Sequence, residues 1–231
     1  MRYIFLTLAL ALAACSVETS APTSTQPAVQ RTAPVGAVTP AVFNQVVTRM
    51  EPVAEAECRA RTRGTNCDFL IQIDRNRNQP PNAFQTLNDN GRPVIIFNVP
   101  LLEDLENADQ LAFVFGHEAA HHIQGHLGRL NENAQAGAVL GGVLASVLGG
   151  SGAAIDAAQQ AGANVGARSY SQSFELEADQ LGTIIAARAG FDPVRGSQYF
   201  LRLRDPGNTF LGTHPPNAQR MEVVRQTAAR L

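Results

Sequence analysis

A short histidine pattern limits the possible folds of this chain more than any other feature. The string His117-Glu118-Ala119-Ala120-His121 follows a run of apolar residues at positions 111–115. On a helix, histidines four residues apart share one face, so both imidazoles can reach a single ion. Glu118 is turned from His117 by about 100° and falls beside such an ion. The string therefore predicts a metal-binding helix with Glu118 as a general base.

The apolar residues around this string argue against a surface helix with its histidines in water. Two buried histidines and a buried glutamate are costly without a partner, and a metal ion supplies one. A string of this kind arises by chance in roughly one chain of this length in two hundred. Further ligands are therefore needed to support the interpretation.

A later segment, Phe174-Glu175-Leu176-Glu177-Ala178-Asp179, offers the third ligand that zinc catalysis normally requires. On a helix, Glu175 and Asp179 share a face while Glu177 points elsewhere. We therefore predict Glu175 as the third ligand. Asp179 is expected to orient a ligand histidine through its other ring nitrogen.

A fifth histidine, His214, stands in the loop sequence Thr213-His214-Pro215-Pro216. In this position it could donate a hydrogen bond to the oxyanion of a tetrahedral intermediate. It could also occupy the open coordination position in a resting state. The alternative is a loop histidine that only precedes a helix.

The N-terminus has the features of an export signal. Met1-Arg2 is positively charged, and residues 3–14 are mostly apolar but too few to span a bilayer. The sequence Leu12-Ala13-Ala14-Cys15 resembles a bacterial lipobox, which implies cleavage before Cys15 and acylation of that residue. An ordinary secretory signal with a chance cysteine is the alternative. Ser16 favours the outer membrane, because the familiar inner-membrane retention residue at that place is aspartate.

Composition supports an exported protein with one folded region. We expect a signal peptide at 1–14, a flexible tether rich in Ser, Thr, Pro and Ala at 15–40, and one domain at 41–231. The formal net charge of -2 gives no reason to expect a nucleic-acid partner. In an oxidising compartment Cys58 and Cys67 are expected to form a disulfide, with two free thiols as the alternative.

The remaining patterns predict an α+β fold that is mostly helical. A helix begins at Pro40 after an N-cap at Thr39 and is kinked or restarted by Pro52. Three strands are expected at 68–74, 84–87 and 94–98, with a hairpin turn at Asn90-Gly91. Further helices are expected at 108–127, at 172–189 with Gly190 as its cap, from Pro193, and after Pro216.

Residues 137–155 carry no charge and contain six glycines and two serines. We expect a packed or partly mobile helical element beside the active site. A membrane-spanning helix is the alternative, and the glycines argue against it.

These motifs together resemble the HtpX/BepA-type metallopeptidases, gluzincins related to the CAAX prenyl protease. The resemblance covers about residues 43–225. The matching residues are His117-Glu118-x-x-His121 with His126, Glu175-x-x-Ala178-Asp179, Thr213-His214-Pro215 followed by Arg220, and Pro81-Asn82-Ala83-Phe84. His122 departs from the apolar residue usual after the motif, and its role is left open.

The resemblance implies a zincin-like domain, a small antiparallel sheet on the helix of His117, and one zinc ion. It also implies Glu175 rather than Glu177 as the ligand, and an edge strand near 94–98 that aligns extended substrate. Arg220 is expected to steady the transition state or hold His214, with an ordinary helix arginine as the alternative.

The predicted function is a zinc-dependent endopeptidase, anchored to the periplasmic face of the outer membrane, that cleaves misfolded or unassembled envelope proteins. One rival is an assembly factor whose proteolysis is inhibited by His214 and the glycine-rich segment. Another is a zinc-buffering protein that uses the histidine cluster.

Overall fold

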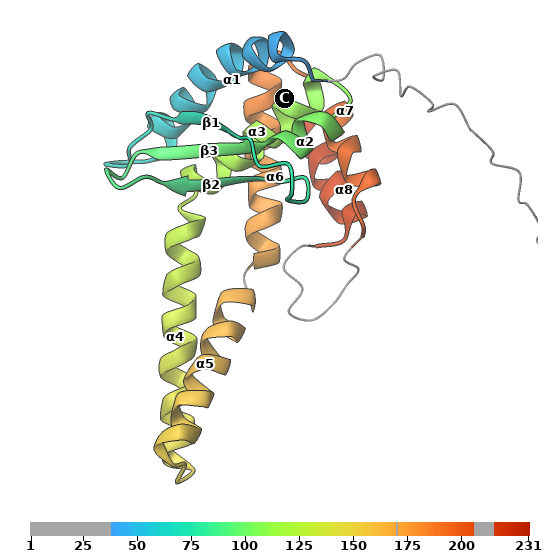
Figure 1. The fold of residues 1–231 in the computed structure, drawn as a ribbon. Coiled ribbons are helices and arrows are strands. Elements are labelled where there is room, and N and C mark those ends of the chain that lie inside the picture. The colour runs from blue at the N-terminus through green and yellow to red at the C-terminus, as the bar shows by residue number, and fades with distance from the viewer. Residues whose placement is uncertain (1–37, 170, 206–214) are drawn as a thin grey trace, which may run out of the picture. The chain divides into compact units, whose positions relative to one another are not determined.

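The computed structural model describes residues 38–169, 171–205 and 215–231, and its ribbon is mostly helical with one small sheet (Figure 1). Helix α1 (Pro40–Arg61) begins where the Thr39 side chain accepts a hydrogen bond from the Val42 amide. Pro52 lies inside this helix and does not end it, so of the two predicted effects, a kink or a restart, the restart was wrong. The buried face of the helix continues past Pro52 to Ala54 and Cys58. A disulfide joins Cys58 at its end to Cys67, with a Cα–Cα distance of 5.7 Å.

The sheet has three strands in the order β1-β3-β2: β1 (Leu70–Asp74), β3 (Pro93–Asn98) and β2 (Ala83–Leu87). Strands β2 and β3 form the predicted antiparallel hairpin, and Gly91 in its turn has a φ of 71°. Strand β3 pairs with β1 in parallel, so the sheet is mixed rather than antiparallel. The reason is the long connection after β1, which carries the chain past the position that β3 then fills.

The prediction that residues 94–98 form an edge strand was also wrong, because β3 is central. Both faces of β3 are covered: of its six residues, only Ile96 is not buried. A nearly continuous apolar strand is typical of a central position. Strand β2 is the edge that lies beside helix α3.

Two helices carry the candidate site, α3 (Ala108–Ile123) and α6 (Ser171–Arg188). The single helix predicted at 108–127 was wrong at its end. Gly125 has a φ of 64°, and a left-handed residue ends α3 because it cannot continue a right-handed helix. Helix α4 (His126–Val147) then starts in a new direction, which Figure 1 shows below the sheet.

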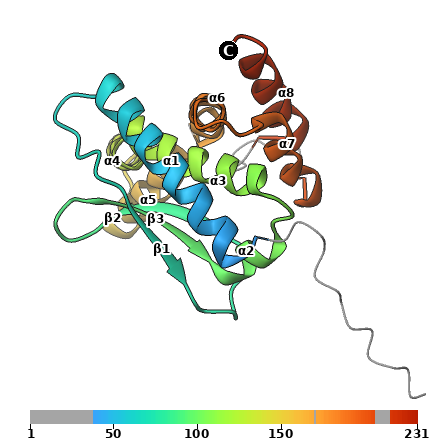
Figure 2. The ribbon, with the colours of Figure 1, turned by 90° about the horizontal axis from the view of Figure 1, so that it is seen from above.

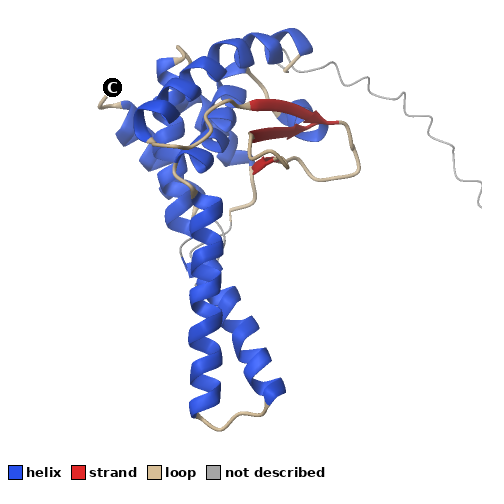
Figure 3. Ribbon diagram, turned by 90° about the vertical axis from the view of Figure 1, so that its left-hand side faces the viewer, coloured by secondary structure: helices blue, strands red, loops and turns tan. Residues whose placement is uncertain are grey.

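Helices α4 and α5 (Gly152–Ser169) form a hairpin, and the two ribbons run side by side in Figures 1 and 3. Residues 137–155 fall at the end of α4, in the turn and at the start of α5, so the expected helical character is confirmed. Their expected place beside the active site was wrong, because they form the tip of the hairpin, away from α3 and α6 (Figure 1). Within the described ranges, no helix combines the length and apolar character needed to cross a membrane.

The core lies between α1, the sheet and α3. Rings of Phe43, Phe97 and Phe115 meet there, with centroids 5.8 Å and 6.2 Å apart along the series. Viewed from above, α1 crosses over the sheet while the C-terminal helices lie beyond α3 (Figure 2). The shorter elements are α2 (Val99–Asp104), α7 (Pro193–Ser197), the 3-10 helix η1 (Gln198–Arg202) and α8 (Asn217–Ala228).

Candidate metal centre

Helices α3 and α6 bring the three predicted ligands together. His117 and His121 come from α3, and their Nε2 atoms are 3.0 Å apart. Glu175 of α6 lies with its carboxylate oxygens 3.5 Å from His117 Nε2 and 3.3 Å from His121 Nε2. One ligand atom from each of the three lies within 4.8 Å of the other two. These three donors can therefore share one ion.

Two glycines set the separation between the helices. A Cβ built on Gly116 would lie 2.7 Å from the Gly182 carbonyl oxygen, and a Cβ on Gly182 would lie 2.7 Å from the His117 amide nitrogen. The backbones thus touch directly. Gly182 lies two turns after Glu175 on the same face of α6. The contact therefore holds Glu175 opposite the histidines.

His117 is oriented by a buried charged pair. Its Nδ1 lies 3.0 Å from Asp179 Oδ1, so an N–H there donates to the carboxylate and leaves Nε2 facing Glu175. Arg220 of α8 donates to both oxygens of Asp179 at 2.7 Å, and its guanidinium lies 3.9 Å from the centroid of the Phe200 ring. Arg220 is only 6% exposed, which excludes an ordinary surface arginine.

These groups shift one another's protonation. Burial alone would raise the pKa of Asp179, but the Arg220 guanidinium and the His117 hydrogen bond hold that pKa below its usual value. Burial opposes protonation of His117, yet the carboxylates of Asp179 and Glu175 outweigh it and raise its pKa to about 10. The pocket therefore favours a positive charge at the position of His117.

His121 has a different support, which sequence reasoning missed. Its Nδ1 lies 2.8 Å from His126 Nδ1, and His126 Nε2 lies 3.3 Å from Glu177. Arg129 also donates to Glu177 at 2.8 Å. Burial and the neighbouring His121 lower the pKa of His126 to about 4, so His126 is neutral. A neutral His126 can accept a hydrogen bond from His121 while donating one to Glu177.

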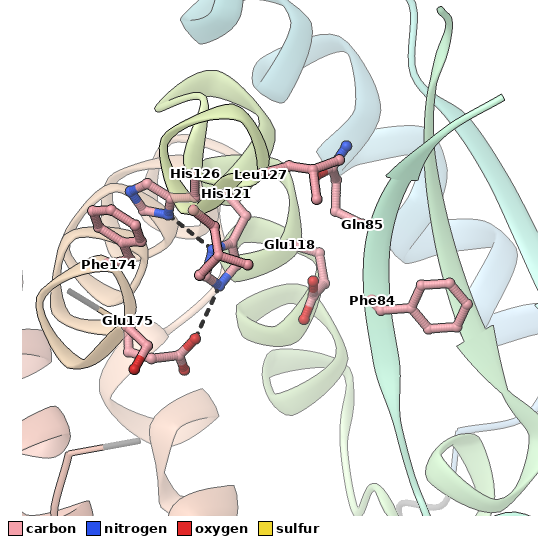
Figure 4. Close-up of a pocket in the computed structure, with 10 residues that line it drawn as sticks. Phe84, Gln85, Glu118, His121, His126, Leu127, Phe174 and Glu175 are labelled. Carbon is pink, nitrogen blue, oxygen red and sulfur yellow. Dashed lines mark hydrogen bonds and ion pairs between the residues drawn. The ribbon is translucent and has the colours of Figure 1, made fainter. Parts of the chain in front are cut away.

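Glu118 lies on the open side of the three ligands. It lines two adjoining pockets together with His121 and Glu175. Phe84 and Gln85 of the edge strand β2 line the first of them, and Figure 4 shows Glu118 between this strand and the His121–Glu175 pair. A carboxylate placed beside the ligands can exchange a proton with a molecule bound there.

The other predicted site residues have different outcomes. His214 and Cys15 lie outside the described residues, so their proposed roles stay predictions. His122 is turned away from the ligands and meets the Asn66 carbonyl oxygen at 2.7 Å. Burial lowers the pKa of His122, and this residue ties α3 to the segment before β1.

The donor set suits a divalent cation. Imidazole and carboxylate are ligands that zinc accepts, and three protein ligands leave a position for water or substrate. Glu118, Glu175 and Asp179 contribute three carboxylates, against the single guanidinium of Arg220. A metal-binding His117 must be neutral, and two negative charges are then left over in the pocket, which a doubly charged ion balances.

The fold and this site define a metallopeptidase. A family model described as Peptidase family M48 matches residues 40–228, and the chain belongs to that family. It is similar to the beta-barrel assembly-enhancing protease of Yersinia pestis, with 32% identity over 167 residues, covering 67% of this chain and 34% of that protein. The Escherichia coli K12 protein of that name is 31% identical over 176 residues, covering 71% and 34%.

A putative beta-barrel assembly-enhancing protease of Vibrio cholerae is 35% identical over 136 residues, covering 53% of this chain and 28% of that protein. The chain thus spans about a third of the length of the curated relatives it matches. The recognised resemblance to this peptidase group is confirmed by these matches.

Proposed function

We propose that this metallopeptidase is a zinc-dependent endopeptidase of the cell envelope that cleaves misfolded or unassembled proteins. The observation that carries the chemistry is the convergence of His117, His121 and Glu175 within 4.8 Å, with Glu118 lining the same pocket. Two nitrogen donors and one carboxylate match the ligands of hydrolytic zinc sites.

The three ligands would hold the ion, and a bound zinc ion would polarise the peptide carbonyl and make water more acidic. Glu118 accepts the proton of the attacking water and returns it to the leaving amine. Asp179 and Arg220 keep His117 in the tautomer that presents Nε2 to the site. His214 remains a candidate donor to the oxyanion.

Strand β2 suits the alignment of an extended substrate. It is an edge strand whose Phe84 and Gln85 line the pocket that also contains Glu118. A peptide added alongside β2 would pass the catalytic carboxylate with its backbone extended. Recognition through backbone groups suits unfolded segments of varied sequence, which supports a quality-control role.

The proposed location rests on the lipobox-like sequence that ends at Cys15 and on the names of the relatives. Acylation there would hold the enzyme at the outer membrane, and the relatives' name refers to β-barrel assembly. The rival with a latent protease also fits that name, and it predicts that assembly is supported equally well by an inactive variant.

The decisive test pairs metal analysis with cleavage of unfolded casein. We expect one zinc ion per wild-type chain, and Glu118→Gln should retain that ion while cleavage falls by about 10²–10⁴-fold. Cleavage at the wild-type rate by Glu118→Gln would remove this residue from its role. Several exchangeable ions per chain, together with no dependence on Glu118, would favour the zinc-buffering rival.

The location is tested separately by mass spectrometry of the N-terminal peptide and by fractionation of the envelope. Acylated Cys15 in the outer-membrane fraction is the expected result. A Cys15→Ser variant should leave that fraction, and retention of this variant there would contradict the lipid anchor.

A further inference from the structure

Helix α4 exposes a continuous apolar stripe on the side that faces away from α5. The stripe consists of Val139, Leu140, Val143, Leu144 and Val147, together with Leu148, which caps the end of the helix. Their spacing of one, four, five, eight and nine residues places them on one face of the helix. Between 57% and 78% of each residue is exposed. Scattered apolar residues on a surface need no explanation, but six on one face mark an interaction surface.

The contact between α4 and α5 is made by small residues rather than by large apolar ones. A Cβ on Gly137 would lie 2.1 Å from the Gly162 carbonyl oxygen, and one on Gly141 would lie 2.2 Å from the Ala158 carbonyl oxygen. Small residues therefore fill the contact while large apolar residues point outward. A helix pair in water normally buries its large apolar residues. Small residues inside and large ones outside are the arrangement of helices packed in lipid.

The charge pattern agrees with a lipid partner. No charged residue occurs between Glu132 and Asp156, a stretch that contains the whole stripe. Asp156 is exposed on α5, the helix that lies against the other side of α4. The stripe rises about 14 Å along the helix, less than half of the 30 Å hydrocarbon core, so it suits one interface rather than a span.

We propose that this α4 stripe binds the surface of a phospholipid bilayer, with its side chains at the boundary between headgroups and acyl chains. The link from Cys15 to Thr39 is 24 residues and can extend at most roughly 80 Å. An acylated Cys15 would therefore keep the stripe near a bilayer. Membrane docking goes beyond the proposed peptidase function and does not depend on catalysis.

The test places a fluorescent probe on the stripe in the full chain. Val143→Cys is labelled with an environment-sensitive dye and added to phosphatidylethanolamine–phosphatidylglycerol vesicles that carry nitroxide on their acyl chains. Gln160→Cys on the exposed part of α5 is the matched control. The unsubstituted protein gives the background labelling. We expect a blue shift and strong quenching for Val143→Cys, and neither for Gln160→Cys.

Each other outcome overturns the proposal. Absence of quenching at both positions excludes lipid contact, and equal quenching at both excludes a single lipid-facing side of the hairpin. A blue shift without vesicles that grows with protein concentration assigns the stripe to a second copy of the chain. A blue shift on addition of unfolded casein, again without vesicles, assigns it to substrate.

A triple variant gives an independent measurement. Leu140→Ser, Val143→Ser and Leu144→Ser together should weaken vesicle binding by at least about tenfold, because three exposed apolar side chains are lost. Cleavage of a soluble peptide should be unchanged, and circular dichroism checks the helix content. Ala153→Ser, Ala157→Ser and Ala161→Ser on exposed positions of α5 form the matched control. Equal vesicle binding by both triple variants would overturn the proposal.

Discussion

Nδ1 of His121 lies 2.8 Å from Nδ1 of His126, so a metal-binding imidazole is supported by a second imidazole from the following helix. Glu177 accepts the hydrogen bond at the far side of His126. Nδ1 of His117 meets a carboxylate directly, whereas Nδ1 of His121 is linked to one through His126. Both ligand histidines are therefore fixed in orientation, one by a single hydrogen bond to a carboxylate and the other by a chain of two hydrogen bonds.

Replacing His126 should weaken metal binding without removing a ligand. We expect His126→Phe to lower zinc affinity by about 10–100-fold, because His121 loses the acceptor that fixes its ring. Competition with a chromogenic chelator measures the affinity. His122→Phe is the control, since His122 contacts the Asn66 carbonyl oxygen and no ligand. Equal losses in the two variants would argue against the supporting role of His126.

Removing Arg220 should destabilise the protein far more than removing its neighbour on α8. Arg220→Met leaves the buried Asp179 carboxylate without its counter-charge, and we expect a loss of about 3–5 kcal/mol in unfolding free energy. Arg225→Met breaks only an exposed pair with Glu222 and should cost less than about 1 kcal/mol. Urea unfolding of the metal-free proteins measures both. A difference below about 1 kcal/mol would contradict the structural role of Arg220.

Adding one methyl group between α3 and α6 should disturb the site from within. Gly116→Ala places a Cβ against the Gly182 carbonyl oxygen, so the helices must separate. We expect a stability loss of about 1–3 kcal/mol and weaker zinc binding. Gly128→Ala on α4 meets nothing within 4 Å and should be neutral or stabilising. Thermal unfolding and zinc titration decide the matter, and normal zinc binding by Gly116→Ala would refute this account.

Reducing the Cys58–Cys67 disulfide should lower stability without affecting the site. The bridge joins residues nine apart in sequence, and closing such a loop stabilises by roughly 2–3 kcal/mol. For a chain of this size, that corresponds to a fall in Tm of about 5–10 °C on reduction. The Cys58→Ala, Cys67→Ala double variant should have the lower Tm without reductant, and adding reductant should not change that Tm. If reductant lowered the Tm of that variant by the same amount, the change in Tm would not come from the disulfide.

Local patterns predicted the helical part of the fold well. The cap at Thr39 begins α1, and Gly190 follows α6 with a φ of 78°. These signals depend on a few neighbouring residues. The path of the sheet depends on pairing across distance. The apolar run at 94–97 is typical of a central strand, but it does not show whether a neighbouring strand is parallel or antiparallel. The mixed sheet was therefore not predicted.

The candidate site was likewise predicted only where it depends on local sequence. Helix geometry predicted that His117 and His121 share a face with Glu118 beside them. It also predicted that Glu175 and Asp179 share a face of the later helix. Gly125 lies inside the stretch 108–127 that was predicted as one helix, and only its left-handed backbone reveals that His126 returns towards His121. Arg220 reaches Asp179 from a separate helix, a contact that no periodicity in the sequence could reveal.

Arg220 follows His117 by 103 residues, and this distance along the chain bears on when the enzyme becomes active. A chain emerging N-terminus first presents both histidines, Glu175 and Asp179 before it has the guanidinium that pairs with these two acids. Docking those acids in the core without it is unfavourable by several kcal/mol. Packing of the last described helix, α8, is therefore needed to complete the site, and a chain that ends before Arg220 is expected to be inactive.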